Sequence, residues 1–470
     1  MKTRNLIYIV LLPLLFTTCK PVVDDFTPSS GSADFTSFVA IGNSLTAGYA
    51  AGALYKSGQE VSFARIIAQQ MAYAGGNGQF KIPLMPTEDG VGIAEVTETG
   101  MVLRTKLVLG YSKDCLGETS LGPVPANPDP DQQKLFTELT TSVAAQGPFN
   151  NVAVPGIKVT HLFAPGLGMM NPFYGRFATD PVNDRLIDEP AKVNPTFFSF
   201  WIGNNDVLDY AASGGLLPLT PVDGGIGTGF QASYEAALEI IMKVVSKGIV
   251  ANIPDVTSIP FFTTVPYNAI VLTNQDDVDL LNQAYAPYNQ LMEVNKLPYR
   301  INWELGPNPM VIWDKDMPLP QPFAQYKFRQ AKEGELILLT VPQDSLKCAR
   351  WGTAKPIPDV YSLTETEIGN IKTATDQFNA IIKENADANG LAFIDVNALL
   401  NKLKSQGIMQ DGVFFTAAFV TGNFFSEDGI HMSPQGNAMV ANFFIQAINT
   451  KYNANIPQVS VTDYSPLILP

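Results

Sequence analysis

Five short and almost continuously apolar segments are the feature of this 470-residue chain that most constrains its fold. They lie at residues 38–41, 151–154, 197–202, 248–253 and 391–395. Their apolar residues run together instead of alternating with polar ones, which is typical of strands that are covered on both faces. The segments therefore predict a buried parallel sheet at the centre of the molecule.

Helices are predicted between or after these strands. Apolar side chains recur at helical spacing in four stretches, at residues 62–73, 233–245, 364–389 and 433–448. Thr364, with Glu367 three residues later, predicts a capping box, and Ser433 followed by Pro434 predicts an N-cap and a first helical residue. The alternation of strands and helices indicates an α/β layer architecture.

The spacing of the predicted strands is uneven. Roughly 100 residues separate the first strand from the second and about 130 separate the fourth from the fifth, far more than a βαβ crossover needs. We therefore expect a single domain over residues 35–455 with insertions at about 75–148 and 256–360, followed by a tail at 456–470. Two strand-like runs in the second insertion predict a small β element, at residues 310–313 and 335–340.

The N-terminus is similar to a bacterial lipoprotein signal. Two cations precede an apolar run at residues 6–16, which is too short to span a bilayer and fits a signal-peptide core. Small residues then lead to Cys19. We expect a signal peptide at 1–18, lipid on Cys19 and a tether at 19–34, which would make the protein an outer-membrane lipoprotein of the cell envelope. The alternative is an ordinary cleaved signal with an incidental cysteine.

The charge balance excludes one class of partner. The chain has 44 acidic and 30 basic residues, a net charge of -14, and no dense run of Lys or Arg. Phosphate affinity depends on clustered positive charge, so a general nucleic-acid binder is excluded.

Two cysteines, Cys115 and Cys348, remain beyond the predicted lipidation site. They can form a disulfide only if their Cα atoms come within about 7 Å, which the sequence leaves open. Neither belongs to a cluster of cysteine and histidine of the kind that binds zinc, and we expect neither a metal nor an organic cofactor.

Candidate catalytic residues follow the predicted strands, where ligand sites form in doubly wound sheets. Ser44 comes directly after the first strand, in a turn that would expose its hydroxyl, although a serine there can also serve only as a helix N-cap. A serine nucleophile needs an imidazole base, and the chain has only His161 and His431. Asp428 lies three residues before His431 and could orient its ring. His161 has no acidic neighbour in the sequence and is predicted to be structural or a minor part of the pocket wall.

Two further positions suit the binding of an oxyanion. Asn205 ends the third strand, where its amide can donate an N–H to a developing negative charge. Gly156 follows the second strand and can bring a backbone N–H close to a substrate because it has no Cβ. Each of these residues alone is more typical of an ordinary turn.

Together these residues resemble the sequence blocks of the SGNH hydrolases, also called GDSL esterases and lipases. Residues 42–45 resemble the first block, with Ser44 as nucleophile and Asn43 where the family has Asp. Residues 151–156 and 203–206 resemble the second and third blocks, and 428–431 resembles the last. The resemblance implies a three-layer doubly wound, flavodoxin-like fold with a five-stranded parallel sheet.

The resemblance also implies an activity. Ser44, Asp428 and His431 would form a catalytic triad, and Ser44, Gly156 and Asn205 would form the oxyanion hole of a carboxylic ester hydrolase. Its substrate would be a small-molecule, lipid or acylated-glycan ester, with apolar residues 163–170 and 261–262 as candidates for an acyl site. The alternative is a surface lipoprotein that binds glycans or lipids and keeps the hydrolase site only as a vestige.

Overall fold

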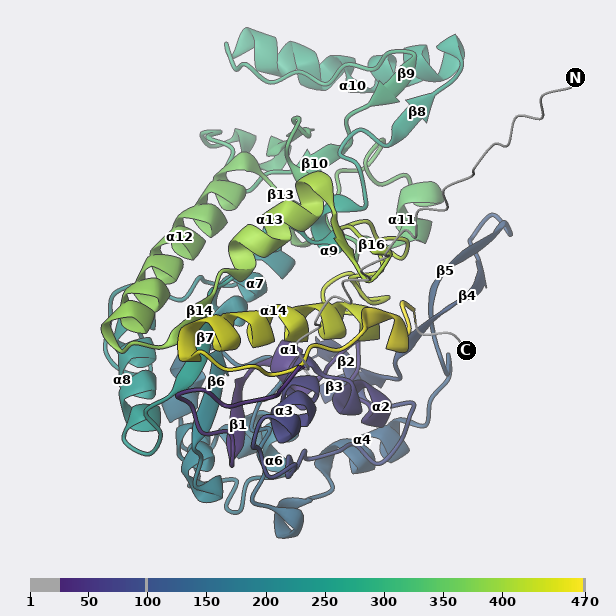
Figure 1. Ribbon diagram of the computed structural model, residues 1–470. Coiled ribbons are helices and arrows are strands. Elements are labelled where there is room, and N and C mark those ends of the chain that lie inside the picture. Colours follow the sequence, from purple (N-terminus) through teal and green to yellow (C-terminus); the bar gives the residue numbers. More distant parts are fainter. Residues whose placement is uncertain (1–25, 98–99, 468–470) are drawn as a thin grey trace, which may run out of the picture.

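The computed structural model describes residues 26–97 and 100–467. A central sheet is surrounded by helices, and an arm that carries α10 (Gln275–Val294) stands off from the body (Figure 1). The predicted signal peptide at 1–18 and the predicted lipidation site Cys19 lie outside the described residues. Within the two described ranges, no helix is both long and apolar enough to cross a bilayer.

The central sheet has four parallel strands in the order β1-β6-β7-β14. They are β1 (Phe38–Gly42), β6 (Phe197–Trp201), β7 (Gly248–Ala251) and β14 (Ala392–Ile394). Val39, Phe198 and Gly248 lie side by side on neighbouring strands. A Cβ at Gly248 would come within 2.4 Å of the Phe198 ring, so only glycine fits there. The prediction of a buried parallel sheet is confirmed.

The sheet has four strands and not the predicted five. The segment at 150–154 runs beside β1 but forms a single parallel bridge, between Ala40 and Asn151. Val152 and Val154 donate their backbone N–H groups to β1 at 3.0 and 3.1 Å. The chain then turns at Pro155, which has no N–H, and at Gly156, whose φ is +77°. The ladder therefore ends before it becomes a strand.

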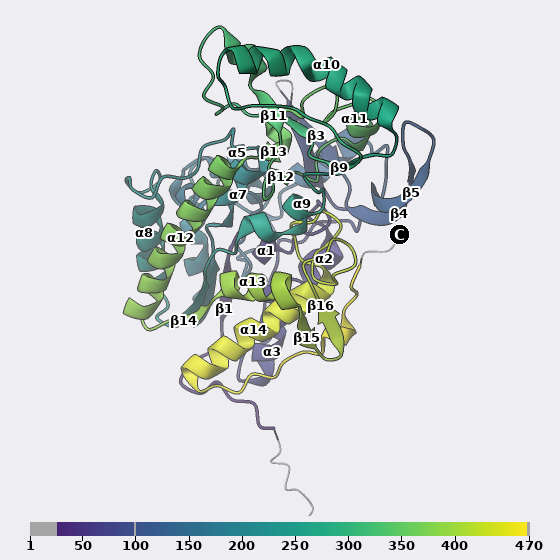
Figure 2. The ribbon, with the colours of Figure 1, turned by 90° about the horizontal axis from the view of Figure 1, so that it is seen from above.

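Helices cover both sides of the sheet (Figure 2). The helices α3 (Phe63–Tyr73) and α14 (Pro434–Tyr452) pack together on one side. On the other side, α12 (Glu365–Ala388) packs on α7 (Asn204–Ala212) and α8 (Phe230–Met242). The predicted caps are confirmed, because Thr364 and Glu367 form a capping box and the Ser433 hydroxyl accepts from Gly436 N. The body also contains α13 (Val396–Gln406) and the short helices α1 (Ser44–Ala47), α2 (Lys56–Glu60), α5 (Leu167–Met170), α6 (Pro172–Gly175) and α9 (Pro260–Thr263).

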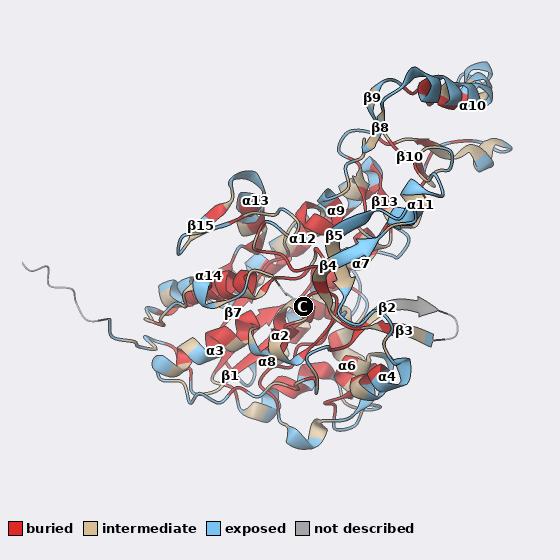
Figure 3. Cartoon of the chain, turned by 90° about the vertical axis from the view of Figure 1, so that its right-hand side faces the viewer, coloured by how far each residue is buried: buried red, intermediate tan, exposed pale blue. Residues whose placement is uncertain are grey.

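The first long connection contains two hairpins and a helix. Antiparallel pairs form between β2 (Gly92–Thr97) and β3 (Gly100–Arg104), and between β4 (Leu107–Lys113) and β5 (Thr119–Pro125). The helix α4 (Gln132–Thr140) follows, with Asp131 as its N-cap. The β4–β5 hairpin lies at the edge of the body, where much of its surface is exposed (Figure 3).

The second long connection forms the arm and several small β elements. The arm pairs β8 (Ile270–Leu272) with β9 (Gly306–Asn308), and it has an apolar cluster of its own that includes Tyr285 and Met292 of α10. Both predicted runs contain a strand, the second one shorter than expected, but they do not form one β element, because each pairs with a different partner in a separate two-stranded sheet. The other elements of this connection are β10 (Val311–Trp313), β11 (Phe328–Gln330), β12 (Leu336–Ile337), α11 (Gln343–Lys347) and β13 (Ser362–Leu363). A last hairpin, of β15 (Ile408–Gln410) and β16 (Val413–Phe415), comes later in the chain, between α13 and α14.

Both ends of the described chain pack against the body. Ser29 pairs with Asn455, and Ser32 donates its backbone N–H to Tyr452 O at 2.8 Å. Part of the predicted tether, from Ser29 onward, therefore belongs to the folded body. The predicted C-terminal tail is also packed, because Ile456 and Val461 are buried in the main core.

Candidate active site

Ser44 is presented by the turn between β1 and α1. Asn43 is the N-cap of α1, and its side-chain oxygen accepts from Leu45 N at 3.1 Å. The Asn43 amide nitrogen also donates to the side-chain oxygen of Asn204, at 2.9 Å. A carboxylate at position 43 could not donate this second bond. Asn43 therefore ties the turn that presents Ser44 to the start of α7.

Asp428 and His431 form a close pair in the loop before α14. His431 Nδ1 lies 2.8 Å from Asp428 Oδ2. The other carboxylate oxygen accepts backbone N–H groups of Ile430 and His431, at 2.9 and 2.8 Å, and the hydroxyl of Ser426 at 3.1 Å. These bonds fix the carboxylate, and the carboxylate fixes one ring nitrogen of His431. The other ring nitrogen, Nε2, is left to act as a base.

The charge of Asp428 is strongly favoured. Burial alone would raise the pKa of its carboxyl group, but the neighbouring His431 and the hydrogen bonds to the carboxylate outweigh burial and hold the pKa well below its usual range. Asp428 is therefore ionised at neutral pH. An ionised partner stabilises the imidazolium that forms when His431 accepts a proton.

Tyr49 packs against His431. The two ring centroids are 4.8 Å apart, and the Tyr49 hydroxyl donates to Gly52 O at 2.7 Å. Burial raises the pKa of Tyr49 to about 12, so its hydroxyl keeps its proton and remains a hydrogen-bond donor. Tyr49 thus restricts the His431 ring on this side without placing a charge of its own beside it.

Asn205 contacts the loop that follows the 150–154 segment, next to Gly156. Asn205, in the first turn of α7, donates its amide nitrogen to Ile157 O at 2.9 Å. This bond orients the amide and leaves its second N–H for another acceptor. A Cβ built on Gly156 would meet no heavy atom within 4 Å, so the backbone there borders open space. Both positions can therefore approach a bound substrate.

The five predicted site residues border one cavity of about 1350 Å³. Its lining includes Ser44, Gly156, Asn205, Asp428 and His431. The structure thus brings together groups that the sequence spreads over almost 390 residues. The cavity also contains Met170 and Phe261 from the predicted acyl-site segments, whereas Phe262 is fully buried in the core.

His161 lies outside this cavity lining, as its structural interpretation predicts. Its Nδ1 accepts the backbone N–H of Lys158 at 3.2 Å within a short helical turn. Burial and the nearby Lys158 charge lower the pKa of His161, which favours its neutral form. His431 is therefore the histidine positioned to act on a substrate.

Several site residues were missed in the sequence. Gly52 donates its backbone N–H to Asp428 Oδ2 at 2.8 Å, and Arg104 donates from Nε to Gly52 O at 3.2 Å. Gly52 has a φ of +74°, and a Cβ there would come within 2.5 Å of the Arg104 guanidinium. A glycine so soon after Ser44 is a sequence signal for a turn with positive φ at this position, but nothing in the sequence relates Arg104 to Asp428.

Among the described residues, no group of three or more His, Cys, Asp or Glu side chains is placed to hold a metal ion. Comparison of the whole chain with protein-family models and with curated proteins found no match.

Proposed function

We propose that the protein is a carboxylic ester hydrolase of the SGNH type. The observation that carries this proposal is the shared cavity, in which Ser44 is joined by the hydrogen-bonded pair of His431 and Asp428 and by the two candidate oxyanion donors. This set contains a nucleophile, a base with an orienting carboxylate, and donors for a developing negative charge. Each group has a distinct part in acyl transfer.

The first half of the proposed reaction forms an acyl-enzyme. His431 Nε2 takes the proton of the Ser44 hydroxyl as Oγ bonds to the ester carbonyl carbon, and the carbonyl electron pair moves onto oxygen. When that oxyanion collapses, the bond to the alcohol oxygen breaks. The proton held by His431 passes to this oxygen, and the alcohol leaves.

The second half releases the acid. A water molecule gives a proton to His431 and attacks the acyl carbon, and collapse of the second oxyanion returns the proton to Ser44 Oγ. In both halves the negative oxygen would be held by the backbone N–H groups of Ser44 and Gly156 and by the Asn205 amide. Asp428 stays ionised and stabilises the charged form of His431.

The sheet topology supports the same family. With the 150–154 segment beside β1, the spatial order is that segment, β1, β6, β7 and β14. In chain order this is 2-1-3-4-5, the order of a doubly wound flavodoxin-like sheet with its ligand site at the carboxyl ends. We therefore include the three-layer fold with five strands in the proposal, with the first edge strand reduced to a bridge.

We also propose that the enzyme is an outer-membrane lipoprotein held through Cys19. The proposal rests on the signal-like N-terminal sequence. Mass spectrometry of the mature N-terminus should find acyl chains on Cys19, and a bare N-terminal residue would contradict the anchor without affecting the ester hydrolase.

A chromogenic butanoyl ester tests the proposed activity. The soluble domain should hydrolyse it, and Ser44→Ala should reduce kcat/KM to the background rate while thermal unfolding stays unchanged. Equal rates for the two proteins would assign the activity to a contaminant. No turnover by the folded wild type, with ester panels of varied acyl and alcohol groups, would favour a vestigial site in a binding lipoprotein.

A further inference from the structure

The cavity at the candidate active site is larger and more apolar than the chemistry of ester cleavage requires. Its volume of about 1350 Å³ exceeds the roughly 300–1,000 Å³ of most small-molecule pockets. Beyond the catalytic groups, the wall is mostly hydrophobic and comes from both long insertions. Examples are Met101, Leu107 and Pro123 from the first insertion and Val265, Met310 and Leu346 from the second.

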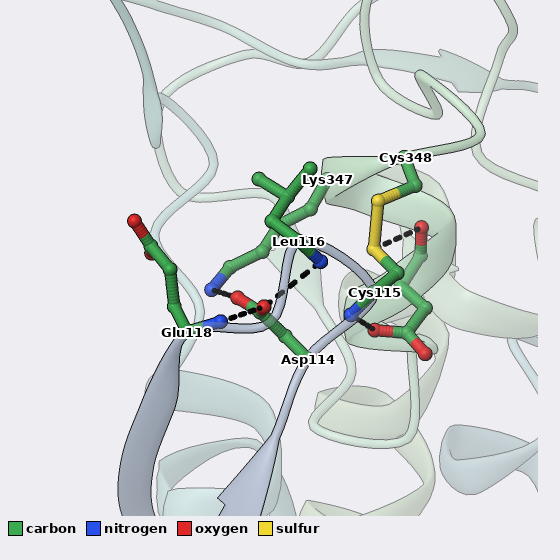
Figure 4. Close-up of a disulfide and its surroundings, with 7 residues drawn as sticks. Asp114, Cys115, Leu116, Glu118, Lys347 and Cys348 are labelled. Carbon is green, nitrogen blue, oxygen red and sulfur yellow. Dashed lines mark hydrogen bonds and ion pairs between the residues drawn. A yellow bond between two sulfur atoms is a disulfide. The ribbon is translucent and has the colours of Figure 1, made fainter.

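The two insertions are joined covalently beside this cavity. Cys115, in the turn between β4 and β5, forms a disulfide with Cys348, directly after α11, across a Cα–Cα distance of 6.5 Å (Figure 4). Two polar contacts surround the bond. Lys347 Nζ lies 2.7 Å from Asp114 Oδ2, and Cys115 N donates to Asp344 Oδ1 at 3.0 Å. We call the disulfide and these two contacts the clasp.

The clasp is the main attachment of the β4–β5 hairpin tip. The base of the hairpin is fixed to the body, because Leu107 N donates to Ala51 O at 2.7 Å. Toward the tip, the side chains of Tyr111, Leu116 and Leu121 are exposed by 74%, 65% and 54%. Such a two-stranded hairpin gains little stability by itself in water. Its position therefore depends on the clasp.

The clasp also determines where two walls of the cavity stand relative to each other. Leu107 and Pro123 line the cavity from the hairpin, and Leu346 and Lys347 line it from α11. The disulfide directly follows α11, and it holds the hairpin against this helix. Without it, the apolar wall would open on this side and admit water.

We propose that the clasp shapes a chamber that binds the apolar chain of a large ester, and thereby sets the chain-length preference of the enzyme. This proposal rests on the proposed ester hydrolase function. An ester with a long apolar chain suits the chamber because Ser44 and the hydrophobic walls line the same cavity, so the chain of an ester bound at Ser44 can extend along those walls. Each methylene that the chamber buries favours binding and catalysis, whereas a short acyl group reaches only the catalytic end.

The test compares acetyl and decanoyl esters of one chromogenic alcohol. In the double variant Cys115→Ser and Cys348→Ser, kcat/KM for the decanoyl ester should fall by at least about tenfold, with less than about a twofold change for the acetyl ester. Glu118→Gln, in the same hairpin turn, is the matched control and should keep both values. An equal change for the two esters, or no change, would overturn the proposal.

Reversible reduction of the wild type covers the case in which the double variant does not fold. Dithiothreitol should produce the same selective loss, reoxidation should restore the decanoyl rate, and a folded double variant should not respond. Reduction without any effect on the ratio of the two rates would overturn the proposal as well.

A binding measurement separates this proposal from the proposed function. The neutral fluorescent probe N-phenyl-1-naphthylamine should bind to Ser44→Ala, and opening the clasp should weaken its binding at least about fivefold. If no ester is cleaved but the probe still depends on the clasp, the hydrolase proposal fails and the chamber stands. If esters are cleaved but probe binding ignores the clasp, the chamber proposal fails.

Discussion

Gly52 donates its backbone N–H to Oδ2 of Asp428 at 2.8 Å, and the same carboxylate oxygen contacts His431 Nδ1. The carbonyl of Gly52 accepts from Tyr49 and from Arg104. One residue thus links the acid of the candidate triad to a side chain of the first insertion. The first insertion is therefore connected to the Asp428 carboxylate through Gly52, and it also lines the cavity.

Arg104→Met should lower kcat for acetyl and decanoyl esters alike, by up to roughly fivefold, because loss of one hydrogen bond worth about 1 kcal/mol loosens Gly52. KM for the acetyl ester should stay nearly constant. Lys106→Met is the control, since it removes the same charge two residues away, where Lys106 packs over the Tyr55 ring. Equal losses in both variants would assign the effect to charge and not to Gly52.

Asn205→Ala should lower kcat by roughly 10²- to 10³-fold with a smaller change in KM, because an oxyanion donor acts mainly in the transition state. Steady-state kinetics with a short-chain ester separates the two constants. Asn370→Ala removes an amide that is bonded to Tyr210 outside the cavity lining and should be nearly neutral. An effect on KM alone would instead make Asn205 a substrate-binding residue.

The pH dependence should show a single essential base. Since the pKa of Asp428 is held well below its usual range, Asp428 does not change its charge during an assay between pH 5 and 9. kcat/KM should therefore rise with pH in one step, as His431 loses its proton and can accept that of Ser44. Asp428→Asn should lower the rate and alter this step. A flat wild-type profile, with chemistry rate-limiting, would exclude His431 as the base.

Asp206→Asn should stabilise the protein in a pH-dependent way. Burial raises the pKa of this carboxyl to about 7, although it accepts Val159 N at 3.0 Å. With an unfolded pKa near 3.9, ionisation penalises the folded state increasingly from about pH 4 to about pH 7. The gain in unfolding free energy should grow over that interval and stay constant above it.

Urea unfolding at pH 5 and pH 8 measures this gain. Asp209→Asn, on the same helix, removes a half-exposed carboxylate that pairs with Lys158 and should give no such gain. A larger gain in unfolding free energy for Asp206→Asn at pH 5 than at pH 8 would contradict a raised pKa of the buried Asp206 carboxyl.

Local signals in the sequence predicted local structure well. Thr364 with Glu367 and Ser433 with Pro434 determine helix starts through bonds within a few residues, so their caps could be recognised without tertiary information. The four strands of the sheet were also predictable, because burial on both faces leaves a continuous apolar run. Ser44 and Asn205 could be found from their positions just after two of these strands, whereas Asp428 and His431 were found from their own spacing just before the last helix.

Long-range relations could not be predicted in the same way. The disulfide joins residues 233 positions apart, and the residues of the Arg104–Gly52 bond are 52 positions apart, with two helices and a hairpin between them. The strands β4 and β5, which flank Cys115, are exposed or half-buried at nearly every position, so they lack the continuous apolar pattern of a buried strand. The early end of the 150–154 segment depends on a turn at Pro155 and Gly156 that its apolar residues do not indicate.

Labelling with a fluorophosphonate tests whether Ser44 is a nucleophile activated by His431. Attack by Ser44 Oγ on phosphorus expels fluoride and leaves a stable adduct, which peptide mass spectrometry can locate. One adduct is expected, on Ser44, and it should be absent from Ser44→Ala and strongly reduced in folded His431→Ala. An adduct on another residue, or none on the folded wild type, would show that Ser44 is not the activated nucleophile.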